Sequence, residues 1–110
     1  MVSKDFALTN REGISRIVMR PQAICKCQIG QDWYKNAFDV EFVPGDCYPD
    51  YMEVLRWIED HLSGKELNIE MAVQKLFDYL DGTYDPLSLC VTSKVDDAIT
   101  HFPVEVTKIK

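Results

Sequence analysis

The apolar residues of this chain change their spacing twice, and these changes constrain the fold more than any other feature of the sequence. In the stretch AFDVEFV, residues 37–43, every second residue is apolar, as in a strand with one buried face. From Pro49 onward the spacing becomes three and four, as in an amphipathic helix. Beyond Pro86 the alternation returns in residues 87–93 and 102–108. The sequence therefore predicts strands before and after a helical centre.

Two helices are predicted in that centre. The first begins near Pro49, a residue that suits a first helical turn, and ends at Ser63-Gly64. The second begins at Asn68, a favoured N-cap residue, and closes within residues 81–86, which hold the turn signals Asp-Gly and Asp-Pro. Before the first alternating strand, the run SRIVMRP at residues 15–21 is a short β-prone stretch that ends in proline.

The resulting order is β-β-α-α-β-β. Two hairpins that flank a helix pair predict an α+β fold with a four-stranded antiparallel sheet and both helices on one face. By length the 110 residues make one domain, which we place at residues 14–110, after a flexible polar arm at 1–13. One face of such a sheet would stay poorly covered in a monomer, so we expect a homo-oligomeric ring or barrel.

Charge and hydropathy exclude several classes of function. The formal net charge is -6, whereas duplex nucleic-acid binders usually present a basic face, so we expect a small-molecule or protein partner. No run approaches the roughly 20 apolar residues of a membrane span. The first residues hold no apolar core of a secretory signal, which favours a cytoplasmic protein.

The cysteines do not form a metal-ligand pattern. Cys25 and Cys27 are one residue apart, whereas zinc sites usually use paired knuckles with two to four residues between cysteines. The other cysteines and both histidines are isolated, so we predict no metal site. A disulfide between Cys25 and Cys27 is disfavoured by strand geometry, and the absence of an export signal favours free thiols.

The stretch ICKCQIGQDW, residues 24–33, resembles the reactive segment of the QueF-like family. Its members carry a cysteine and, seven residues later, an aspartate that an aromatic residue follows. Here Cys25, Asp32 and Trp33 keep that spacing, and Gly-Gln at residues 30–31 fits with a shift of one. The resemblance therefore implies that Cys25 and Asp32 belong to one functional motif.

The likeness extends beyond this motif. The following stretch FDVEFVP looks like the family's next strand, and the order of elements agrees over residues 15–107. The family belongs to the tunnelling-fold superfamily, whose ββααββ units build rings. The resemblance therefore implies a tunnelling fold for this chain.

The chemistry that the resemblance implies takes place on a nitrile. Cys25 would attack the nitrile carbon of 7-cyano-7-deazaguanine to form a covalent thioimide, and Asp32 would serve as acid and base. The commonest reaction of the family is reduction to the 7-aminomethyl base with NADPH as cofactor. Alternatives are amidine formation with ammonia and a binding protein of the same fold that has lost catalysis. A reactive Cys25 needs positive charge or donors nearby, whereas an inert one would be a small buried hydrophobe.

The superfamily also places a glutamate at the start of the second helix to hold the purine-like ring. Glu70 is the matching acid, and Asn68 precedes it as cap, so both are predicted to bind substrate. Glu70 could equally serve only the positive end of the helix dipole. The family normally shows His-Glu here; this chain shows Asn68-Ile69-Glu70, so the histidine is missing and the glutamate is displaced by one.

One further departure and the length of the chain bear on the cofactor. The family's NADPH-associated phrase has no match in PDYMEVLRW, residues 49–57. The compact length is closer to the amidine-forming relatives, which use ammonia. The first half of the chemistry is thus better supported than the second.

Overall fold

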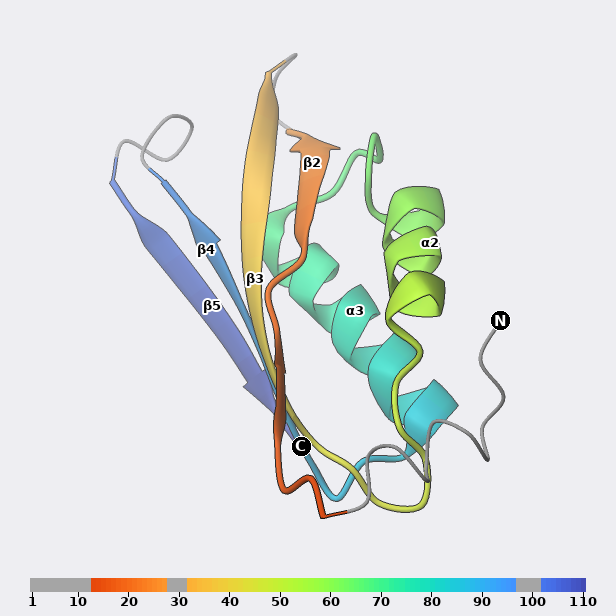
Figure 1. Cartoon of the computed structure of the whole chain (residues 1–110). Helices are drawn as coiled ribbons and strands as arrows, with labels where there is room; N and C mark the ends of the chain where they lie inside the picture. Colours follow the sequence, from red (N-terminus) through yellow and green to blue (C-terminus); the bar gives the residue numbers. More distant parts are fainter. Residues whose placement is uncertain (1–12, 28–31, 97–101) are drawn as a thin grey trace.

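A twisted antiparallel sheet with two helices against one of its faces makes up the computed structural model (Figure 1). The structure describes residues 13–27, 32–96 and 102–110. The predicted arm, apart from Gly13, lies outside these residues, as do Gly30, Gln31 and His101.

The elements follow the predicted order along the chain, but the sheet has five strands rather than the predicted four, because its first strand is divided in two. The strands are β1 (Ile17–Met19), β2 (Gln22–Lys26), β3 (Trp33–Val43), β4 (Ser88–Val95) and β5 (Val104–Ile109). Both β1 and β2 pair with β3, and the order continues through β4 to β5, all antiparallel.

The division of the first strand lies at Pro21. Proline has no N–H to give to a ladder, but its carbonyl still accepts a bond of 2.9 Å from the Phe38 N–H. The first run therefore ends at Pro21 as predicted, but a strand that was not predicted, β2, begins directly after it at Gln22. The strand predicted to start at residue 37 in fact begins at Trp33.

The helices are α2 (Tyr51–His61) and α3 (Ile69–Tyr84). Asp50 caps α2, and the predicted cap Asn68 is confirmed, because its side-chain oxygen accepts from the Met71 N–H at 2.7 Å. The helix α3 continues through Asp81-Gly82 and ends only at Asp85, which adopts a left-handed conformation with φ 45°.

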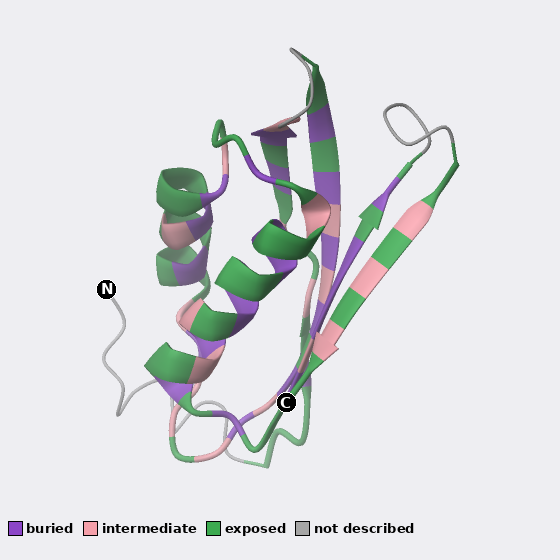
Figure 2. Cartoon of the chain, turned by 180° about the vertical axis from the view of Figure 1, so that it is seen from behind, coloured by how far each residue is buried: buried purple, intermediate pink, exposed green. Residues whose placement is uncertain are grey.

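The core lies between the helices and the sheet (Figure 2). Along β3 every second residue from Tyr34 to Phe42 is buried, so this strand alternates over nearly its whole length. The largest fully buried apolar side chains are Phe38, Phe42, Ile58, Leu62, Leu76, Leu80 and Leu89. Among the described helices, none is long and apolar enough to cross a membrane.

The connection between the helices runs along the outer edge of β2. Three backbone bonds attach it: Gly64 N–H to the Ile24 carbonyl (2.8 Å), Lys26 N–H to the Lys65 carbonyl (2.8 Å), and Leu67 N–H to the Lys26 carbonyl (3.2 Å). Gly64 has φ +76°, a conformation that glycine adopts without strain. We call residues 62–67 the covering segment, because they close this edge of the sheet.

Candidate active site

Cys25 lies on the helix-facing side of β2, beneath the covering segment. Its exposed fraction is 0%. The sulfur receives a hydrogen bond from the Asn36 side-chain N–H at 3.3 Å, and its own S–H donates to the Leu62 carbonyl at 3.4 Å. Burial raises the pKa of the Cys25 thiol, and the hydrogen bond from Asn36 acts in the opposite direction. In this conformation Cys25 is a neutral, fully bonded thiol.

A line of buried polar groups crosses the sheet at Cys25. The Ser93 hydroxyl on β4 donates to the Asn36 oxygen on β3 at 2.8 Å, and Asn36 in turn donates to the sulfur. Ser93 and Asn36 both have an exposed fraction of 0%. We call Ser93, Asn36 and Cys25, with the Leu62 carbonyl, the buried polar line.

Sequence reasoning did not find Asn36 and Ser93. The signal was present: extending the apolar alternation back from Phe38 and forward from Val91 places both polar residues on the buried face. A polar residue in an apolar register needs a partner, and these two provide one for each other.

The end of β2 meets the start of α3 around Tyr34. Tyr34 lies opposite Cys25 in the strand register, and its hydroxyl donates to the Leu67 carbonyl at 2.5 Å. Its pKa is raised to about 12, mainly by burial, with further contributions from negative charge on Cys25, Cys27 and Glu70. The hydrogen bond to Leu67, the residue before the cap of α3, places the Tyr34 hydroxyl between the end of β2 and the start of α3.

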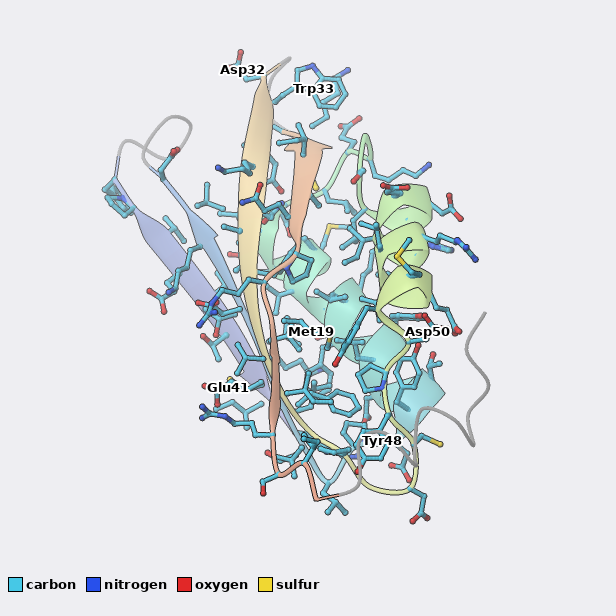
Figure 3. All side chains as sticks on the ribbon, viewed as in Figure 1. Met19, Asp32, Trp33, Glu41, Tyr48 and Asp50 are labelled. Carbon is cyan, nitrogen blue, oxygen red and sulfur yellow. The ribbon has the colours of Figure 1, made fainter. Side chains whose placement is uncertain are left out.

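Asp32 does not reach Cys25 in this conformation. It is exposed at the end of β3, and its backbone carbonyl accepts from the Cys27 N–H at 2.8 Å. Figure 3 shows Asp32 at the tip of the hairpin, on the side away from the helices. Trp33 beside it is 56% exposed. No hydrogen bond joins the two predicted catalytic side chains among the described residues.

The two predicted substrate-binding side chains differ in whether the helix already uses them. The Asn68 side-chain oxygen is occupied as the helix cap. Glu70 is exposed in the first turn of α3, and its charge acts on Tyr34. The Glu70 carboxylate is therefore open to solvent at the start of α3, whereas the Asn68 side chain serves the helix itself.

Two hollows lie elsewhere on the described surface. One of about 330 Å³ lies between β1 and α2, where Val18 and Leu55 are among its lining residues. The other, of about 230 Å³, lies on the sheet face away from the helices and includes Cys90. Cys25 lines neither hollow. Within the described part of the chain, no three metal-ligating side chains gather to hold an ion.

Comparison with known proteins gives a structural likeness alone. No family model matches the chain, and no curated protein matches its sequence. A solved structure described as the archaeosine synthase QueF-Like in the apo form superimposes with a TM-score of 0.81. The likeness covers 90% of this chain and 96% of that one, at 18% sequence identity. The predicted α+β tunnelling fold is thereby confirmed.

Proposed function

We propose that this chain is a QueF-like enzyme that attacks the nitrile of 7-cyano-7-deazaguanine with the sulfur of Cys25. The shared fold and the seven-residue spacing from Cys25 to Asp32 support this function. The observation that carries it is the meeting of the end of β2 with the residues just before α3. The Leu67 N–H donates to the Lys26 carbonyl. The hydroxyl of Tyr34, the residue opposite Cys25, donates to the Leu67 carbonyl, next to the cap of α3.

The first step forms a thioimide. Cys25 gives its proton to the Asp32 carboxylate, and the thiolate sulfur forms a bond to the nitrile carbon. One π pair of the C≡N bond moves to nitrogen, which takes a proton from Asp32. Since the sulfur is covered in the described conformation, the covering segment must first move off it. The Asp32 side chain must also turn towards the sulfur.

The second step releases the product. In amidine formation, ammonia adds to the thioimide carbon, a C–N bond forms, and the Cys25 thiolate leaves. This outcome has the support of the structural likeness, since that protein is described as an archaeosine synthase. We therefore place amidine formation ahead of reduction.

Reduction remains the second outcome. It needs two hydrides, hence two NADPH, to take the thioimide to the aminomethyl base. In the described conformation the sulfur meets an amide and a backbone carbonyl, so a dinucleotide, like the base itself, would reach it only after the covering segment moves. The attack on the nitrile requires no NADPH in either case.

Glu70 is the group that we assign to the base. Its carboxylate can accept two N–H donors from a guanine-type edge, and it is exposed next to the site. Asn68 supports this role by capping α3 and so holding the first turn in place.

Assembly of several chains is part of this proposal. The outer edge of β5, and that of β1, pair with no strand among the described residues. Val18 on β1 and Ile109 on β5 are exposed apolar side chains on these edges. Edge pairing between copies would close a ring and satisfy both rows of backbone groups. Sedimentation showing only monomer at micromolar concentration would contradict it.

A non-catalytic binding protein is the second candidate, and one observation favours it. The Cys25 sulfur is fully covered, both of its hydrogen-bonding roles are used, and burial raises its pKa. A purely structural thiol has these properties.

Intact-mass spectrometry after mixing protein with the nitrile base separates the two candidates. We expect a mass increase equal to that of the base, lost in Cys25→Ala and kept in the control Cys90→Ala. Ammonia and NADPH, added separately, then show which one discharges the adduct. Binding of the base without an adduct would favour the non-catalytic protein. An adduct lost only in Cys27→Ala would move the nucleophile two residues along the chain.

A further inference from the structure

We propose that Asn36 is a positioning residue for Cys25, and that Ser93 sets its orientation so that an N–H donor faces the sulfur. This inference rests on the proposed function in one respect: the proposed function supplies the reaction in which the Cys25 sulfur takes part. The hydrogen bonds themselves belong to the described structure.

The amide of Asn36 can in principle sit in two orientations, related by exchange of its oxygen and nitrogen. The Ser93 hydroxyl donates to the oxygen at 2.8 Å, which leaves the nitrogen to face Cys25 at 3.3 Å. Since Asn36 and Ser93 are both fully buried, water does not replace either partner. Ser93 therefore selects the orientation that supplies a donor to the sulfur.

The two polar groups on the sulfur favour opposite protonation states. The Leu62 carbonyl accepts the S–H and would face a thiolate unfavourably. The Asn36 N–H is compatible with both states and binds the thiolate more strongly, because the bond becomes charge-assisted. The pair thus holds a neutral thiol at rest and retains a donor for the reactive form.

These two groups also belong to different elements. Leu62 belongs to the covering segment, whereas Asn36 lies in β3, which is paired on both sides, with β2 and with β4. Movement of the covering segment would remove the carbonyl that favours the thiol and leave the N–H that favours the thiolate. Opening the site would therefore also make Cys25 more acidic.

The test measures the protonation of Cys25 directly, from the carbon-13 chemical shift of its β-carbon against pH, without any nitrile. We expect Asn36→Leu, and to a smaller degree Ser93→Ala, to raise the pKa of Cys25. Ser93→Thr keeps the hydroxyl and should keep the wild-type value. The control Ser88→Ala changes an exposed serine on the same strand and should have no effect.

The adduct rate gives the second readout. At a fixed pH near neutrality, we expect Asn36→Leu to form the nitrile adduct about tenfold more slowly, since it loses a charge-assisted bond to the nucleophile. Raising the pH should restore part of the rate, which a merely structural defect would not show. If Asn36→Leu fails to fold, Ser93→Ala and Ser93→Thr make the same comparison.

The outcomes are distinguishable. An unchanged Cys25 pKa in folded Asn36→Leu, or in folded Ser93→Ala, overturns the assignment. If that pKa rises as expected while the wild-type protein forms no adduct, the role of Asn36 is supported and the proposed function alone fails.

Discussion

The two faces of the sheet each carry a line of polar side chains across β3, and the two lines differ in almost every physical respect. On the helix side, the buried polar line is neutral and lies out of contact with water. On the opposite side, Asp39 forms ion pairs of 2.9 Å with Arg20 and with Lys94, and all three side chains are at least partly exposed. Figure 3 shows Glu41, a neighbour in this second line, on the side of the sheet away from the helices.

The difference shows that polar groups contribute strongly to the stability of the fold on the buried face and only weakly on the exposed face. A buried donor or acceptor has no water to replace a lost partner, so each bond in the buried polar line is required. Exposed ion pairs exchange with water and salt, so their net contribution is small. The residues closest to the candidate nucleophile therefore belong to the line whose geometry is most strictly determined.

The largest expected contrast concerns the thiols of the two faces. Cys90 is half-buried on the ionic face, whereas Cys25 is fully covered. We expect iodoacetamide to modify Cys90 at least about a hundredfold faster, because Cys25 reacts only after an opening that requires a few kcal/mol. Peptide mass spectrometry over time measures both rates in one sample. Equal rates would show that the covering segment is open in solution.

The second contrast is in stability. Asn36→Leu removes the donor to Cys25 and leaves the Ser93 hydroxyl buried without its acceptor. We expect the free energy of unfolding to fall by about 1–3 kcal/mol, measured by urea denaturation.

The double variant Asn36→Leu, Ser93→Ala sharpens this prediction. Removing the orphaned hydroxyl should recover part of the lost stability, because replacing both partners by apolar groups is far less destabilising than removing one. Strictly additive losses would show that the hydrogen bond between Asn36 and Ser93 contributes nothing.

The sequence predicted the fold better than the site, for a physical reason. Apolar spacing reports which face of each element is buried, and it correctly gave the helix pair and the strands on either side of it. The N-cap preference of asparagine gave the cap at Asn68. Apolar spacing does not report where a strand resumes after a proline, so β2 was missed. The order of elements alone indicates the α+β fold.

The site depends on contacts that span distant positions. Cys25 and Asp32 are seven residues apart in the motif, but they lie on different arms of the hairpin formed by β2 and β3. Their spacing in the sequence therefore does not determine the directions of their side chains, and only Cys25 faces the helices. The cover over the sulfur comes from Leu62, 37 positions along the chain. Such a contact follows from tertiary structure and leaves no local pattern in the sequence.

A smaller effect is expected on the ionic face. Asp39→Asn removes the charge that pairs with Arg20 and Lys94. The Asp39 side chain is about a third exposed, so solvent screens these pairs, and we expect a loss below about 1 kcal/mol. The loss should shrink further in high salt, as measured by thermal melting in low and high sodium chloride. A loss as large as that of Asn36→Leu would remove the distinction between the two faces.

The smallest expected effect is a pH dependence of stability that is confined to the ion pairs of Asp39 on the exposed face. The hydrogen bond and charge of Lys94, with those of Arg20, hold the pKa of Asp39 below its usual value of about 4. A group with a lowered folded-state pKa stabilises the fold above its unfolded pKa and loses that contribution as the pH falls through the folded one. The melting difference between wild type and Asp39→Asn should therefore be constant from pH 7 to about 5 and vanish in stronger acid. The difference for Asn36→Leu should not change over this range, because burial raises the pKa of Cys25 and no other group of its line titrates. A parallel acid dependence of both variants would show that the two faces are electrostatically coupled through the sheet.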